Sequence, residues 1–170
     1  EDKFKNKEFH EKVIYVKKNE GLIKEIIDTR KYDSIIKKAI YYHNKFSIDI
    51  DDSVVQCKII RDADKIDIIH IVADLGEINL NEDDNGISDF VKEDFKNERL
   101  VNRLHKSTKN DATLTMVAFV FDLNFDYSFN YFNDNKFIDK IYSKLKNKEL
   151  FSPYIDIANN YVKKRCNNGN

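Results

Sequence analysis

Residues that break helices and form tight turns are scarce in this sequence, which has only 4 glycines and 1 proline among 170 residues. All-β folds need many such turns, so the scarcity argues against them and favours long helices. Hydrophobic residues make up 41% of the chain, which is enough for a core. Since domains commonly contain about 100–200 residues, we expect a single domain over residues 1–170.

Cysteine is rare as well. The two cysteines, Cys57 and Cys166, lie far apart and outside any CxxC or Cys/His zinc pattern. We interpret both as reduced thiols of a cytoplasmic protein. No apolar run approaches the roughly 18 residues of a membrane span, so we expect no membrane contact. No signal peptide is visible, and the chain begins at Glu1 instead of Met, which suggests a fragment or a processed product.

Neither sign of charge is in excess, because 29 Lys and Arg residues oppose 30 Asp and Glu residues and the formal net charge is -1. Bulk charge therefore gives no reason to expect binding to nucleic acid or to an anionic membrane. The sequence also contains no P-loop, no dinucleotide fingerprint and no Ser-His-Asp pattern. Its function must be inferred from a few histidines and carboxylates.

Apolar residues recur at helical spacing along most of the chain. The pattern predicts helices over residues 9–27, 31–43, 54–75, 87–104 (as one or two short helices), 111–124, 125–145 and 152–164. We therefore expect an all-α fold, a single bundle of roughly seven helices. Asn110 is a plausible cap of the helix 111–124, and Ser152 and Pro153 fit the cap and first position of the last helix.

The expected helix 54–75 opens with a capping box formed by Ser53 and Gln56. It carries apolar stripes on two opposite sides, which predicts a central helix that is buried on both. Each stripe contains one aspartate, so Asp62 and Asp64 point in different directions. We expect Asp62 to anchor a neighbouring helix.

A histidine ends the expected helix 31–43, in the motif Ala39-Ile40-Tyr41-Tyr42-His43-Asn44. The carboxyl end of a helix is the negative end of its dipole and favours a cation. Two alternatives follow. His43 is either a half-buried capping residue that carries the charge itself as an imidazolium, or a ligand that holds a metal ion there.

The segment Arg61-Asp62-Ala63-Asp64-Lys65-Ile66-Asp67 places three carboxylates and two cations within two helical turns. These charges could form salt bridges between helix neighbours on a solvated face. Their apolar surroundings argue otherwise, because a buried carboxylate is costly unless a metal, a histidine or an arginine accompanies it. A functional carboxylate is therefore a second interpretation of this segment.

The stretch Ala63-Asp64-Lys65-Ile66-Asp67 resembles the Ala-Asp-Lys/Arg-Leu-Asp motif of HD-domain metal-dependent phosphohydrolases. The motif that ends at His43 and the apolar run 116–123 resemble a bacterial branch of that family, so the resemblance covers about residues 10–145. It implies a helical bundle that holds one or two divalent metals, such as Mn²⁺, Fe²⁺, Mg²⁺ or Zn²⁺.

The resemblance also implies roles for individual residues. Asp64 would be a metal ligand of the catalytic site, and His43 a further ligand or a phosphate contact. Lys65, beside Asp64 in the catalytic motif, and Arg61 would bind the phosphate of the substrate. The substrate would be a small phosphorylated molecule or a nucleotide, and the metal would activate a water and clamp a phosphoryl oxygen.

The sequence departs from that family in two respects. Its early histidine and its His-Asp dyad are absent, since the four histidines are followed by Glu11, Asn44, Ile71 and Lys106. The resemblance implies that these ligands lie upstream of Glu1. His10 is a third candidate metal ligand, because the bacterial branch often has a histidine before the helix that ends with Glu-Gly-Leu-Ile. The second departure is its spacing to Glu20-Gly21-Leu22-Ile23, which differs by one residue.

Two functions stay open at this point. The first is an HD-family phosphohydrolase that is incomplete in this chain, and the second is a non-catalytic α-helical binding or regulatory module derived from an HD domain. Under the first, His43 and Asp64 should lie within about 7 Å of each other, the span of a shared metal or one bridging water. A nucleic-acid binder has little support beyond scattered lysines, and the sequence does not indicate an oligomeric state.

Overall fold

The computed structural model describes residues 31–46, 55–75, 80, 82–102, 104 and 107–167. The chain divides into two compact units, Glu1–Lys38 and Ala39–Asn170, and most of the described residues belong to the second. The expected helix 9–27 and the capping box at Ser53 lie outside the described residues. That residues 1–170 form one domain stays a prediction.

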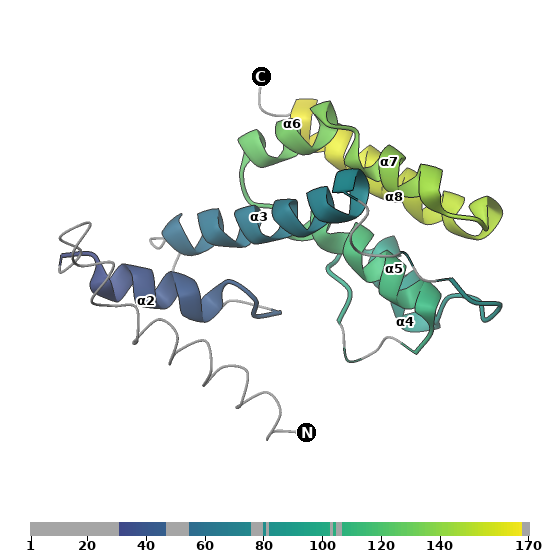
Figure 1. The fold of residues 1–170 in the computed structure, drawn as a ribbon, viewed down its shortest axis with the longest axis horizontal. Coiled ribbons are helices and arrows are strands. Elements are labelled where there is room, and N and C mark those ends of the chain that lie inside the picture. The colour runs from purple at the N-terminus through teal and green to yellow at the C-terminus, as the bar shows by residue number, and fades with distance from the viewer. Residues whose placement is uncertain are drawn as a thin grey trace. The chain divides into compact units, whose positions relative to one another are not determined.

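The described residues form seven α-helices and two shorter helical turns, without a strand, which confirms the all-α prediction. The turns continue two of the helices, η1 as a π-helical turn after α3 and η2 as a 3₁₀ turn after α5 (Figure 1). In chain order the elements are α2 (Asp33–Tyr42), α3 (Val55–His70), η1 (Ile71–Leu75), α4 (Asp89–Lys96), α5 (Lys109–Val117), η2 (Ala118–Asp122), α6 (Asp126–Asp134), α7 (Phe137–Lys144) and α8 (Lys148–Asn167).

The core of the second unit is built around α8, which contacts α4, α5, η2, α6 and α7. Figure 1 shows α8 beside α6 and α7. The helix buries one stripe at helical spacing, formed by Phe151, Ile155, Ala158 and Val162. Aromatic side chains from residues 119–137 complete this core, and Phe129, Phe132 and Phe137 are fully buried.

The end of α3 is fastened to α7 through η1. Asp74 in η1 lies 2.9 Å from Nδ1 of His70 and 2.5 Å from Nζ of Lys140. One turn further along α7, Nζ of Lys144 donates a hydrogen bond of 2.8 Å to the carbonyl of Val72. These contacts fix the carboxyl end of α3 against α7.

The prediction that α3 is buried on two opposite sides is wrong. Val55, Ile59 and Ile60, near its amino end, are exposed. The helix buries a single face, formed by Cys57, Arg61, Asp62, Lys65 and Ile69. The spacing of apolar residues shows which side chains could be buried, but only neighbouring elements decide which of them are covered.

Three helix boundaries also differ from the predictions. Thr108, not Asn110, caps α5, in a capping box with Asp111. The expected helix 125–145 is divided between α6 and α7 by Lys136, whose φ of 53° is left-handed. The last helix begins at Lys148, because the side chain of Asn147 accepts a hydrogen bond from the N–H of Leu150 and caps it.

The prediction that Ser152 and Pro153 begin the last helix is wrong, because Pro153 lies inside α8. Proline has no N–H, so the carbonyl of Glu149 loses the intrahelical bond it would otherwise accept. Burial of the stripe that begins at Phe151 compensates for this loss.

No described helix has the length and apolar character that a membrane span requires.

Candidate functional site

The charged segment of α3 forms a buried cluster with Asp122. Arg61 and Lys65 are one helical turn apart and therefore lie on the same face, where they are only 1% and 5% exposed. The carboxylate of Asp122, at the end of η2, lies 2.5 Å from the guanidinium of Arg61 and 2.7 Å from Nζ of Lys65. One carboxylate oxygen, Oδ2, therefore serves two cations.

Arg61 also binds main-chain carbonyls from the segment around His43. Its guanidinium donates hydrogen bonds of 3.0 Å to the carbonyl of Tyr42 and 2.6 Å to that of Lys45. These two residues bracket His43. The two motifs singled out in the sequence are thus neighbours in space, joined through one arginine side chain.

Burial dominates the electrostatics of Lys65. It lowers the pKa of the ammonium group, because a charged group loses its hydration inside the protein. The negative charge and hydrogen bond of Asp122 act in the opposite direction, while the nearby charge of Arg61 lowers the pKa further. Without Asp122, two cations would be buried side by side, so this carboxylate is essential to the cluster.

Asp62 lies on the same buried face and binds the start of α6. Its carboxylate accepts hydrogen bonds from the main-chain N–H groups of Asn124 and Phe125, at 3.0 and 3.2 Å. The side-chain amide of Asn124 donates a further bond of 2.8 Å. Phe125 is the N-cap residue of α6, where a negative charge is favourable. The prediction that Asp62 anchors a neighbouring helix is confirmed.

The half-buried His43 caps the end of α2. Its Nδ1 lies 2.7 Å from the carbonyl oxygen of Ile40. A carbonyl can only accept a hydrogen bond, so Nδ1 carries the proton and Nε2 is the nitrogen left for another partner. The geometry matches the capping interpretation of His43, while its role as a metal ligand or phosphate contact stays a prediction.

The described residues do not by themselves fit a metal. Among them, no group of three or more His, Cys, Asp or Glu side chains lies close enough together to hold an ion. Catalytic metals generally take about three protein ligands. Asp64 is half-buried on α3, and His10 lies outside the described residues. The divalent metal, and Asp64, His43 and His10 as its ligands, stay predictions.

Asp122 and Asn124 are the members of the cluster that the sequence analysis missed. A signal was present, because Asp122 is the only charged residue between Ala112 and Phe125. A lone charge inside an apolar run must be buried with a partner or lie at the edge of the core. The run thus indicated that a partner was needed, although not which residue it was.

Comparison with known proteins adds no relative to this picture. No protein-family model matches the chain, and neither a curated protein nor a solved structure matches it. The resemblance to HD-domain phosphohydrolases therefore stays a prediction from the two sequence motifs.

Proposed function

We propose that the helices of the second unit form a non-catalytic binding or regulatory module, in which the charged segment of α3 holds elements together. One observation carries this proposal: Arg61 and Lys65 are buried and share the carboxylate of Asp122. Arg61 also donates hydrogen bonds to two main-chain carbonyls near the end of α2. The two cations that the family resemblance assigns to the substrate phosphate therefore already have an anionic partner inside the protein.

A substrate phosphate would have to compete with Asp122 for these cations. Removal of one partner from a buried ion pair costs about 3–5 kcal/mol, because the other charge is left uncompensated. The two side chains are also almost inaccessible, at 1% and 5% exposure, whereas a phosphate-binding cation must be reachable from solvent. Both arguments favour a structural role for the charges of α3.

The proposal predicts that stability and catalysis respond differently to substitution. Asp122→Asn and Arg61→Met should each lower the free energy of unfolding by about 2–4 kcal/mol. The first leaves two buried cations without their carboxylate, and the second leaves the carbonyls of Tyr42 and Lys45 without their donor. Asp64→Asn and His43→Gln, which do not touch that pair, should change it by less than about 1 kcal/mol. Urea unfolding followed by circular dichroism measures these differences. The unaltered chain should not hydrolyse phosphoesters or nucleotides with Mn²⁺, Fe²⁺, Mg²⁺ or Zn²⁺.

Two outcomes would contradict the proposal. One is an unchanged stability in both Arg61→Met and Asp122→Asn, since the cluster would then hold nothing together. The other is metal-dependent hydrolysis by the unaltered chain that is lost in Asp64→Asn while its stability is retained. That second result would identify Asp64 as part of a catalytic site.

The second candidate is the HD-family phosphohydrolase of a small phosphorylated substrate or nucleotide. The hydrogen bonds from Arg61 to the carbonyls around His43 favour it, because they bring the two family-like motifs together. In this candidate Asp64 and His43 act with His10 and with ligands that the described residues do not supply, and Lys65 and Arg61 contact the phosphate. A cytoplasmic location suits both candidates, since Cys57 and Cys166 form no disulfide in the described part of the chain.

A further inference from the structure

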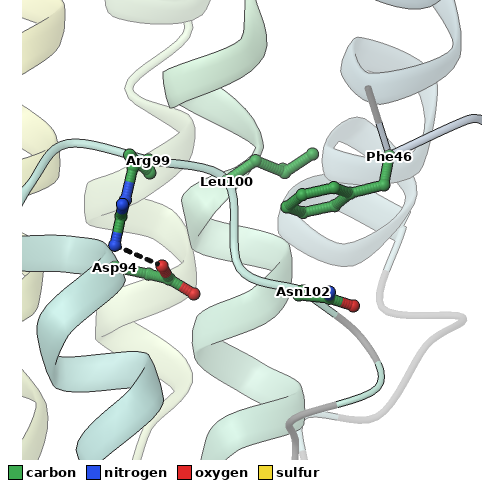
Figure 2. A pocket seen from close by; sticks show the side chains of 5 residues that line it. All are labelled: Phe46, Asp94, Arg99, Leu100 and Asn102. Carbon is green, nitrogen blue, oxygen red and sulfur yellow. Dashed lines mark hydrogen bonds and ion pairs between the residues drawn. The ribbon is translucent and has the colours of Figure 1, made fainter. Parts of the chain in front are cut away.

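A pocket of about 430 Å³ lies apart from the charged cluster of α3. It is lined by Phe46, Asp94, Arg99, Leu100 and Asn102, and Figure 2 shows these side chains. Sites for small molecules commonly measure about 300–1,000 Å³ and combine apolar walls with a few polar groups. The volume of this pocket lies in that range, and its lining combines apolar and polar side chains.

Its apolar walls are Phe46 and Leu100, whose side chains approach each other in Figure 2. Phe46 is 51% exposed, so half of its ring is open to a ligand. Its main chain is held in place, because Arg61 bonds the carbonyl of the preceding residue, Lys45, at 2.6 Å. Leu100 is partly buried and packs against the hydrophobic core.

Two of the three polar side chains in the pocket, Arg99 and Asn102, present hydrogen-bond donors, and the third is the carboxylate of Asp94. The guanidinium of Arg99 is 58% exposed, and its hydrogen bond to a described side chain is a single one of 3.1 Å, to Asp94. A guanidinium has five N–H donors, so several remain for a ligand. The side-chain oxygen of Asn102 accepts from the N–H of Leu104, which leaves the amide nitrogen as its donor. The charge of Asp94 is matched by Arg99.

We propose that this pocket binds a small aromatic carboxylate. The aromatic ring packs between Phe46 and Leu100, where ring–ring and ring–aliphatic contacts stabilise it. The carboxylate accepts hydrogen bonds from Arg99 and Asn102. The planar guanidinium of Arg99 can bond both carboxylate oxygens at once. This inference rests on the proposed function, since it names the ligand class of a binding module.

Indole-3-acetate is a suitable probe because the chain contains 0 tryptophan residues, so excitation at about 295 nm reports only on the ligand. Indole-3-acetamide is its neutral counterpart. Fluorescence anisotropy with the full chain should show saturable binding of the acid, about tenfold tighter than that of the amide, because only the acid gains a charge-assisted hydrogen bond. Phe46→Ala should weaken both ligands, whereas Arg99→Gln should weaken only the acid.

Matched controls come from outside the pocket. Tyr127→Ala removes a more exposed aromatic ring and Lys92→Gln an exposed cation, and both should bind the acid as the unaltered chain does. Equal affinity for acid and amide, or acid binding that neither Phe46→Ala nor Arg99→Gln changes, overturns the proposal, as does the absence of saturable binding. Such a failure leaves the stability and hydrolysis results for the α3 cluster unaffected, so the two proposals fail separately.

Discussion

At the scale of single residues, buried carboxylates join segments that are distant in sequence, and Asp111 does so without a cation. Its fully buried side chain accepts hydrogen bonds from the main-chain N–H groups of Ser88, Ser107 and Thr108, at 2.9, 2.9 and 3.0 Å. Burial alone would raise the pKa of Asp111, but these donors outweigh it and hold the pKa below its ordinary value.

The lowered pKa of Asp111 predicts a pH-dependent contribution to stability. A carboxyl with a lower pKa in the folded than in the unfolded state stabilises the fold above its unfolded pKa, about 3.9, and loses this contribution as the pH falls through the folded value. Asp111→Asn should therefore cost about 1–3 kcal/mol at pH 7, and the difference from the unaltered chain should shrink below about pH 4. Urea unfolding at several pH values measures it. A pH-independent difference would show that shape, not charge, explains the cost.

The sequence indicated which residues of the α3 cluster need partners, but not the partners themselves. Apolar neighbours around Arg61 and Lys65 were correctly interpreted as evidence against a solvated face. Asp122 lies 61 residues away from Arg61, and helical periodicity carries no information about which distant element meets a given face. The partner is decided by how η2 packs, which is a property of the whole core.

At the scale of elements, helix interiors were easier to predict than helix ends. Apolar spacing located α3 and α5 because it reflects a face that must be buried. Their ends depend on local competition between caps. Asn147 caps α8 through one side-chain hydrogen bond and Thr108 caps α5 through its capping box with Asp111, and equally suitable capping residues stand a few positions away.

The break between α6 and α7 gives a prediction at this scale. Lys136 has φ 53° and ψ 39°, a left-handed conformation that costs a residue with a Cβ atom about 1–2 kcal/mol. Lys136→Gly should remove this cost. Glycine also loses more conformational entropy on folding, so the net stabilisation should be at most about 1 kcal/mol. Lys136→Ala removes the same charge but keeps the strain, so it should not stabilise. Thermal unfolding compares them, and a gain in both variants would assign the effect to charge.

At the scale of the whole molecule, composition and periodicity were sufficient for the all-α class but not for the arrangement of helices. Scarce glycine and proline excluded the turns of a β fold, and that inference needs no knowledge of contacts. Which helix becomes central depends on contacts between distant segments. The two apolar stripes pointed to α3, whereas the structure places α8 against α4, α5, α6 and α7.

The central position of α8 predicts how the second unit unfolds. Phe151 is fully buried near the start of this helix, so Phe151→Ala removes contacts and leaves a cavity that should cost about 3–5 kcal/mol. Because α8 contacts four other α-helices, the loss should move one cooperative transition of the unit to lower urea concentration without dividing it. Far-UV circular dichroism and tyrosine fluorescence should therefore report the same lowered midpoint.

Tyr127→Ala, at a ring that is 78% exposed, should change stability by less than about 0.5 kcal/mol. Separate midpoints for the two probes in Phe151→Ala would mean that α8 unfolds apart from the helices it contacts.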